Sequence, residues 1–149
     1  MDNKEDFPAC FPDDFFEKLS QIKVETEALD VYRVGKNGEN NREAFKSTYE
    51  EYIAGEITDK DLDPNDPLIN YSTSCNYKRA KIRGILKMCL KRHPRAKLLK
   101  GKTEITCGPS QITKNRCPER KSDGHVDWWL YKESSPQEYF EICEEKNNV

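Results

Sequence analysis

The sequence has no run of about 20 apolar residues, which is the length that a helix needs to cross a bilayer. Its first six residues carry three acidic side chains and no apolar stretch, so they lack the pattern of a secretory signal. We therefore expect a soluble, cytoplasmic protein that has no membrane partner.

The cysteines lack the spacing of a disulfide scaffold or of a standard zinc site. No Cys-x-x-Cys pair occurs, and the six cysteines are spread along the chain as Cys10, Cys75, Cys89, Cys107, Cys117 and Cys143. Cys89 and His93 stand one helical turn apart, but Cys89 falls on the apolar side of its predicted helix, which favours packing over metal binding. We expect reduced thiols and no metal site.

Acidic residues are missing from residues 70–103, which contain 11 Lys and Arg side chains. Residues 1–69 have the opposite balance, with 18 acidic and 8 basic side chains. The net charge of −2 therefore hides a strong segregation of charge. The basic segment either pairs with the acidic half of the same fold, which is the simpler explanation, or attracts a phosphate-bearing ligand or a nucleic acid.

The chain does have enough aromatic and apolar character for one folded domain. Its 149 residues fit a single domain over 1–149, and 10% of them are aromatic, including the adjacent Trp128 and Trp129. Because hydrophobic residues make up only 35% of the chain, we expect a modest core.

Apolar spacing and turn residues divide the chain into elements that follow an extended lead-in at 1–12. Helices are expected at 13–24, 42–53, 76–93 and 135–146, and strands at 29–34, 68–73, 96–106 and 125–131. A loop as long as 107–124 is either functional or disordered. This order predicts an α+β fold with a small mixed or antiparallel central sheet flanked by three to four helices.

Three polar features suggest chemistry, although a solvated face, a helix cap or a structural His–Asp pair would also explain them. Arg33 lies in the middle of a predicted strand, where a guanidinium can clamp a carboxylate or phosphate. The hydroxyl-rich run Tyr71-Ser72-Thr73-Ser74 precedes a helix N-terminus, which suits a phosphate or a sugar hydroxyl. His125 and Asp127 share one face of the last strand and suit acid–base or charge-stabilising work.

Together these features resemble the pattern of the ADP-ribosyltransferases, which place an Arg on the first core strand, a Ser-Thr-Ser before a helix and an acid near the start of a later strand. The resemblance implies that Arg33 holds a phosphate of NAD and that Ser72 or Ser74 supports the nicotinamide ribose. Asp127 would stabilise the positive charge that grows on the ribose. The hypothesis requires Arg33, Ser72 and Asp127 to converge on one cleft.

The same resemblance places Tyr71 and Thr73 in the cofactor site and makes His125 a further catalytic group. It also implies that loop 107–124 borders the cleft and meets the acceptor, which would be a protein or a nucleic acid. The sequence departs from the family pattern in two places. Its acidic motif is His-x-Asp rather than a Glu-based motif, and the helix expected at 135–146 replaces a final strand.

Three other functions remain open. A nucleic-acid-binding or nuclease domain would use the basic segment 78–102, with His93 and His125 as acid and base. A Cys–His enzyme would use Cys107 as its nucleophile and His125 as its base. A non-enzymatic interaction protein would meet a partner through the acidic half of the chain or through the tryptophan pair.

Overall fold

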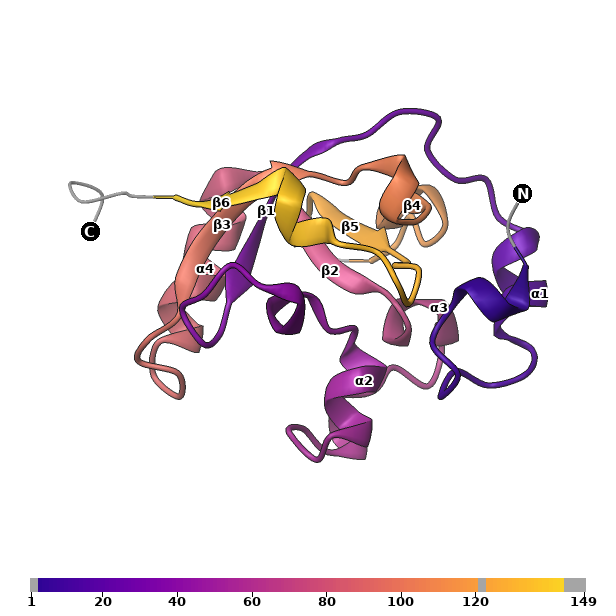
Figure 1. Cartoon of the computed structure of the whole chain (residues 1–149), viewed down its shortest axis with the longest axis horizontal. Coiled ribbons are helices and arrows are strands. Elements are labelled where there is room, and N and C mark those ends of the chain that lie inside the picture. The colour runs from indigo at the N-terminus through magenta and orange to yellow at the C-terminus, as the bar shows by residue number, and fades with distance from the viewer. Residues whose placement is uncertain (1–2, 121–122, 144–149) are drawn as a thin grey trace.

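The computed structural model of the chain describes residues 3–120 and 123–143. Within them, six strands form one antiparallel sheet in the order β4-β5-β2-β1-β3-β6 (Figure 1). The strands are β1 (Asp30–Gly35), β2 (Thr73–Asn76), β3 (Lys97–Lys102), β4 (Ser110–Ile112), β5 (His125–Trp128) and β6 (Phe140–Ile142). The α-helices are α1 (Phe15–Ser20), α2 (Thr48–Ile53), α3 (Pro67–Asn70) and α4 (Arg79–Cys89). The predicted α+β class with a central antiparallel sheet is confirmed.

The sheet consists of two ladders that are joined at one pair. β1 pairs with β3 along its whole length, and β2 pairs with β5 along its whole length. Between β1 and β2, Tyr32 and Asn76 form the paired position. Arg33 on β1 reinforces this joint, because its Nη1 donates a hydrogen bond of 2.6 Å to the carbonyl of Ser74 on β2.

Trp128 and Trp129 are adjacent in the sequence but belong to two different clusters of buried side chains. Trp128 packs in the cluster that includes Phe45, and its Nε1 donates to the carbonyl of Gly108 at 3.1 Å. Trp129 packs in the second cluster, and its Nε1 donates to the carbonyl of Leu68 at 2.9 Å. Both side chains are fully buried. The end of β5 therefore connects the two cores.

The N-terminal segment, which we predicted as an extended lead-in, folds onto the second cluster. It contains the 3-10 turn η1 (Lys4–Asp6), and the buried side chains of Phe7 and Phe11 follow it. Their rings lie 5.1 Å and 4.9 Å from the ring of Phe15 on α1, in edge-to-face contact. Because burying one such ring stabilises a fold by roughly 2–3 kcal/mol, this segment is part of the core.

The predicted strand at 68–73 is wrong. Pro67 instead begins α3 at the first helical position, where a proline loses no helical hydrogen bond. β2 starts only at Thr73 and ends at Asn76, the residue at which we expected the next helix to begin. That helix, α4, therefore begins at Arg79 rather than near residue 76.

The predicted helix at 135–146 is also wrong, and residues 144–146 lie outside the described residues. A single 3-10 turn, η6 (Pro136–Tyr139), leads directly into β6. Phe140 is buried beside β3, where Gly101 leaves room for it, because a Cβ at Gly101 would lie 2.4 Å from the Phe140 ring. Burial of this ring favours the strand over a continued helix.

Two further segments differ from the prediction. The helix expected at 42–53 is divided into η2 (Arg42–Phe45) and α2, because Lys46 is extended and Ser47 starts a new helix with a capping box. The predicted loop at 107–124 contains β4 and η5 (Thr113–Asn115). The remaining 3-10 turns of the described residues are η3 (Asp59–Asp61) and η4 (Ile105–Cys107).

Helix α4 packs against β1, β2 and β3 (Figure 1). Ile82 is its one fully buried residue, so most of the helix surface faces outward. None of the helices in the described part of the chain has the length and apolar character required to cross a membrane.

Candidate functional site

Arg33 serves as an internal bridge. Its guanidinium donates three hydrogen bonds to backbone carbonyls, namely those of Ala44 at 2.8 Å, Ser74 at 2.6 Å and Lys46 at 3.1 Å. Its Cζ atom also lies 5.9 Å from the centre of the Phe45 ring. Three of the five N–H donors of the side chain are thus used within the fold.

Arg33 and Asp127 lie on opposite faces of the sheet. Tyr32 pairs with Asn76, and Asn76 pairs with His125, so these three side chains share one face. Asp127, two residues after His125, projects from that same face, whereas Arg33, next to Tyr32, projects from the other. The prediction that Arg33, Ser72 and Asp127 converge on one cleft is therefore wrong, because the register between β1 and β2 separates them.

Tyr71 and Thr73, which the resemblance placed in the cofactor site, make packing contacts. The Tyr71 ring lies 5.1 Å from the rings of Phe11 and Tyr49, and burial raises the pKa of its hydroxyl. Thr73 is buried, and its Oγ1 donates to the carbonyl of Phe45 at 2.6 Å. These contacts tie the start of β2 to the two cores.

Asp127 is fully buried and accepts three hydrogen bonds from neighbouring side chains. Its Oδ1 accepts a hydrogen bond of 2.6 Å from Ser72 Oγ, so the structure does bring these two predicted residues together. Its Oδ2 accepts from Thr113 Oγ1 at 2.9 Å and from Arg116 Nη2 at 2.7 Å. Arg116 also donates from Nε and Nη2 to the two carboxylate oxygens of Asp66, at 3.2 Å and 2.8 Å.

Two carboxylates hold Arg116 in its charged form. Burial by itself would lower the pKa of Arg116, but the hydrogen bonds and charges of Asp66 and Asp127 outweigh it and raise that pKa. The guanidinium also lies over the Trp129 ring, 5.6 Å from its centre. We did not foresee Arg116 from the sequence, because it lies in a segment that was predicted as a loop. The only sequence feature that points to Arg116 is the basic segment 114–120, which could pair with the acid-rich loop near Asp66.

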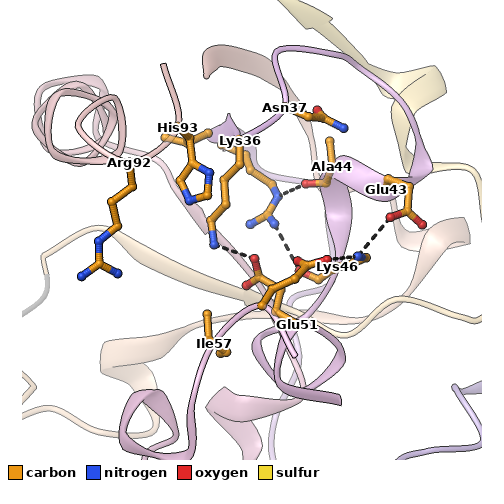
Figure 2. A pocket seen from close by; sticks show the side chains of 12 residues that line it. Lys36, Asn37, Glu43, Ala44, Lys46, Glu51, Ile57, Arg92 and His93 are labelled. Carbon is orange, nitrogen blue, oxygen red and sulfur yellow. Dashed lines mark hydrogen bonds and ion pairs between the residues drawn. The ribbon is translucent and has the colours of Figure 1, made fainter. Parts of the chain in front are cut away.

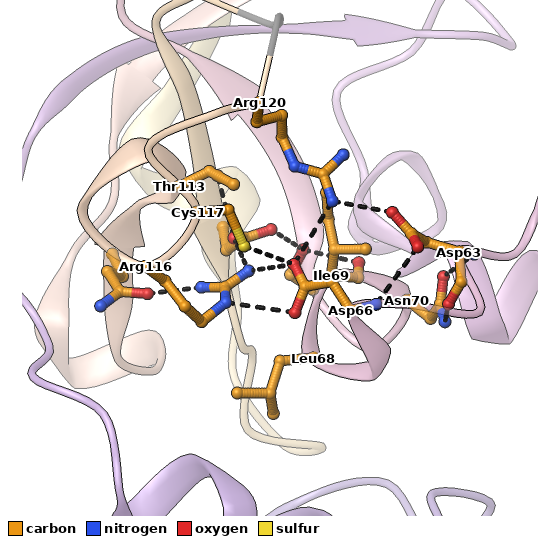
Figure 3. A network of polar contacts seen from close by, with 12 residues as sticks. Asp63, Asp66, Leu68, Ile69, Asn70, Thr113, Arg116, Cys117 and Arg120 are labelled. Carbon is orange, nitrogen blue, oxygen red and sulfur yellow. Dashed lines mark hydrogen bonds and ion pairs between the residues drawn. The ribbon is translucent and has the colours of Figure 1, made fainter.

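A second arginine extends the network toward the surface (Figure 3). Arg120 Nη2 lies 2.7 Å from Asp63 and 3.5 Å from Asp66. The hydrogen bond from Arg120 lowers the pKa of Asp63, and the same bond raises the pKa of Arg120. The loop before α3 and the segment after η5 are therefore held together by two arginines.

His125 contacts Ser74 directly and reaches Asp127 through Thr113. Its Nδ1 lies 2.6 Å from Thr113 Oγ1, and its Nε2 lies 3.1 Å from Ser74 Oγ. Because Thr113 donates its only proton to Asp127, its oxygen accepts from the Nδ1–H of His125. The Nε2 of that tautomer has a free lone pair and accepts from the Ser74 hydroxyl. Burial lowers the pKa of His125, which favours the neutral ring.

Gly124 sets the entry to β5 just before His125. It has φ of 80°, a left-handed conformation that favours glycine, and its carbonyl accepts from the backbone N–H of Tyr77 at 3.0 Å. A Cβ there would lie 2.5 Å from Asn76 Oδ1. The turn therefore depends on glycine, and it positions the first residue of the strand.

His93 lies in a different place, in a pocket of about 320 Å³ that Arg33 also lines (Figure 2). Two ion pairs lie in this pocket: Lys36 lies 2.6 Å from Glu51, and Lys46 lies 3.0 Å from Glu43. Arg92 also lines it. His125 is not among the residues that line it. The structure therefore does not place the two histidines of the nuclease hypothesis in this pocket together.

All six cysteines are free in the structure. Cys107 is buried in the first cluster, and burial raises the pKa of its thiol. Both features are typical of a cysteine that packs in a core rather than of a reactive nucleophile. The two ring nitrogens of His125 contact Thr113 and Ser74, not Cys107. Within residues 3–120 and 123–143, no group of three or more His, Cys, Asp or Glu side chains is arranged to hold a metal ion.

Seven exposed cations of the basic segment have no ion pair or hydrogen bond with any residue that the structure describes. They lie on α4, on the connection after it and on β3, which α4 contacts. We call them the basic surface, which consists of Lys81, Lys87, Lys91, Arg92, Arg95, Lys97 and Lys100. Figure 1 shows α4 and β3 at one end of the molecule and α1 at the other.

No protein-family model, curated protein or solved structure matches this chain.

Proposed function

We propose that this protein binds the phosphate backbone of a nucleic acid through the basic surface. The observation that carries the proposal is that seven of the 11 cations between residues 70 and 103 form no ion pair with an acid of the described residues. Exposed cations of this kind attract phosphates and release condensed counterions when they bind. Such contacts do not read sequence, so binding would be general.

The alternative explanation, in which the basic segment neutralises the acidic half, receives little support from the described ion pairs. Lys102 lies 4.0 Å from Asp30 of that half, and Lys78 pairs with Asp123, which lies outside it. Several acids of residues 1–69 pair with cations of the same half, as in Lys4–Asp13, Lys36–Glu51 and Lys46–Glu43. Asp63 and Asp66 pair instead with Arg120 and Arg116, which also lie outside the basic segment. Much of the positive charge is left facing solvent.

The surface of α4 allows an extended ligand to approach closely. Ala80 and Gly84, one turn apart, are both exposed, and a Cβ at Gly84 would meet open space. The exposed Lys81 and Lys87 lie before and after Gly84 on α4, and Met88, which is 71% exposed, follows Lys87. Small residues between lysines let a phosphate backbone lie against the helix.

Binding of this type is expected to be weak and independent of sequence, with a dissociation constant on the order of 10⁻⁴–10⁻⁶ M at physiological salt. Exposed aromatic side chains that would stack on bases are absent from residues 78–103. Tyr77, which is 41% exposed just before α4, is the nearest candidate. We therefore expect duplexes and single strands to bind with similar affinity.

The test is fluorescence anisotropy of a labelled duplex with the double variant Lys87→Glu and Lys91→Glu. The matched control is Lys23→Glu and Lys60→Glu, which changes the net charge equally at exposed lysines outside the basic surface. We expect the first variant to lose affinity by about tenfold or more and the control to bind like the wild type. Equal losses in both variants, or no binding by the wild type, would contradict the proposal.

The ADP-ribosyltransferase hypothesis fails its requirement that Arg33 and Asp127 share one cleft. A reduced form of it, without Arg33, stays a second proposal, because the Ser72–Asp127 contact supports that part. β6 also supplies a final strand where we had predicted a helix. In this proposal Asp127 stabilises the ribose cation, while Arg33, on the opposite face, takes no part in that step.

Incubation of the protein with NAD tests this second proposal, with the release of nicotinamide as the readout. If the Asp127→Asn variant still released nicotinamide, the result would count against the proposal. If the protein binds neither nucleic acid nor NAD, the hypothesis of a non-enzymatic interaction protein is favoured instead.

A further inference from the structure

We infer that Ser74 is a nucleophilic hydroxyl that His125 activates, and that this site acts on a small carboxylic ester. The two side chains belong to neighbouring strands and lie outside the basic surface. The inference therefore does not depend on nucleic-acid binding, and each can fail without the other.

The sheet register brings Ser74 and His125 together. Ser74 on β2 pairs with Asp127 on β5, and Asn76 pairs with His125, so Ser74 and His125 are diagonal neighbours on one face. The distance from Ser74 Oγ to His125 Nε2 is 3.1 Å, within the range for proton transfer between a nucleophile and its base. Both residues are half-buried, and the His125 side chain is 15% exposed.

Thr113 fixes the orientation of the imidazole. It accepts from Nδ1–H and donates to Asp127, and the direct distance from Nδ1 to Asp127 Oδ1 is 3.9 Å. Thr113 and Asp127 are thus positioning residues: they hold the tautomer whose Nε2 faces the serine. Asp127 also favours the imidazolium that forms when the serine loses its proton.

The charge balance of the network leaves a net negative charge to stabilise that imidazolium. Asp66 and Asp127 carry two negative charges, and Arg116, which bonds both, carries one positive charge. The outer pair of Arg120 with Asp63 is neutral. The network therefore holds one uncompensated negative charge within reach of His125.

An uncharged acyl group fits this half-buried position better than a phosphoryl group does. Moving an anion out of water costs far more free energy than moving a neutral ester. The hydroxyls of Ser72 and Thr113 are buried and bonded to Asp127, so they are not available as the nucleophile. Ser74 is the hydroxyl that remains.

The reaction uses only the ester and water. Ser74 Oγ forms a bond to the carbonyl carbon while its proton moves to His125 Nε2. The bond between the carbonyl carbon and the alcohol oxygen then breaks, and the alcohol leaves with the proton from Nε2. Water repeats both steps on the acyl-serine: it gives a proton to Nε2, the acid departs, and that proton returns to Ser74.

A fluorophosphonate probe tests the nucleophile directly, because a serine that bonds to phosphorus displaces fluoride. We expect mass spectrometry of the native protein to find the adduct on Ser74, and the Ser74→Ala variant to lose it. His125→Gln should label about 100-fold more slowly or less. Ser20→Ala, which removes an exposed hydroxyl on α1, should label like the wild type.

A pH profile of wild-type labelling tests the same idea without any variant. A hydroxyl activated by His125 gives a rate that rises as the ring loses its proton and then levels off. Hydrolysis of p-nitrophenyl acetate should follow the same curve. No adduct on Ser74, a rate that keeps rising with hydroxide, or labelling that is unaffected by His125→Gln would each overturn the inference.

Discussion

Ser72 and Asp127, which are 55 residues apart in the sequence, share a buried hydrogen bond of 2.6 Å. The bond ties the segment between α3 and β2 to β5. Through Thr113 and Arg116, the same carboxylate also ties β5 to the segment after β4. The acid that the sequence suggested as a catalytic group is therefore also the centre of an internal network, so its removal should affect the stability of the whole fold.

Replacing Asp127 with Ala should lower the free energy of unfolding by about 3–5 kcal/mol, because it removes one partner of a buried ion pair. It also removes the carboxylate to which Thr113 and Ser72 donate, although Ser72 keeps the carbonyl of Ile69 as an acceptor at 3.0 Å. Urea denaturation followed by tryptophan fluorescence measures the change. The control is Asp123→Asn, whose carboxylate pairs with lysines at a solvent-exposed position and should matter little. A similar loss in both variants would contradict the central role of Asp127.

The stability of the protein should fall as the pH is lowered below about 6.5, the ordinary pKa of histidine. Burial lowers the pKa of His125 in the folded state, so the unfolded chain binds a proton that the folded chain does not. The stabilising effect is complete above pH 6.5 and is lost as the pH falls toward the lowered pKa. Melting temperatures between pH 5 and 8 measure this. In His125→Gln the slope over that window should disappear, and an unchanged slope would contradict the assignment.

Two glycine-to-alanine substitutions should have opposite effects. Gly108 has φ of 149°, and a Cβ there would lie 2.0 Å from the carbonyl oxygen of Trp129, so Gly108→Ala should destabilise the fold by more than about 2 kcal/mol. At Gly84 the Cβ meets open space on an exposed helix, so Gly84→Ala should stabilise by about 0.5–1 kcal/mol. Chemical denaturation of both variants makes the comparison.

Replacing Arg33 with Met should destabilise the fold by about 3 kcal/mol, because three backbone carbonyls lose their donor at once. Arg33→Lys should recover only part of that loss, since an ammonium cannot reproduce the three-way fork. Urea denaturation of the two variants provides the measurement. If Arg33→Met folded with wild-type stability but lost affinity for NAD, Arg33 would be a ligand-binding residue rather than a bridge.

Thiol reagents should separate the cysteines by burial. Cys10 is exposed and should react with the native protein, whereas Cys75 is buried, and burial raises its pKa to about 12. Titration with a disulfide reagent, followed by peptide mapping, should find Cys10 modified first and Cys75 modified only after unfolding. Rapid modification of Cys75 in the native state would contradict the described packing.

The parts of the fold that local patterns determine could be predicted from the sequence. The β-branched, alternating residues of β1 and the apolar run of β5 identify two central strands, and the apolar spacing around Ile82 identifies α4. The errors lie where tertiary packing outweighs the local pattern. Burial of Phe140 turns an expected helix into a strand, and Pro67 starts a helix where a strand was expected.

The candidate site was predictable only in part, because the register between strands decides which side chains meet. Period-two alternation correctly puts His125 and Asp127 on one face of a strand. Which face of β1 adjoins them depends on the single Tyr32–Asn76 pair, and no local pattern reports it. Arg116 was missed because its partners, Asp66 and Asp127, are brought near it only by the folded chain.

The most direct measurement of the central claim is the salt dependence of binding to a labelled DNA duplex by the wild-type protein. If four or more side chains of the basic surface contact phosphates, the logarithm of the association constant should fall with the logarithm of salt concentration with a slope of about −3.5 or steeper. Binding that is insensitive to salt, or no binding at about 50 mM salt, would contradict the assignment of the basic surface as a nucleic-acid site.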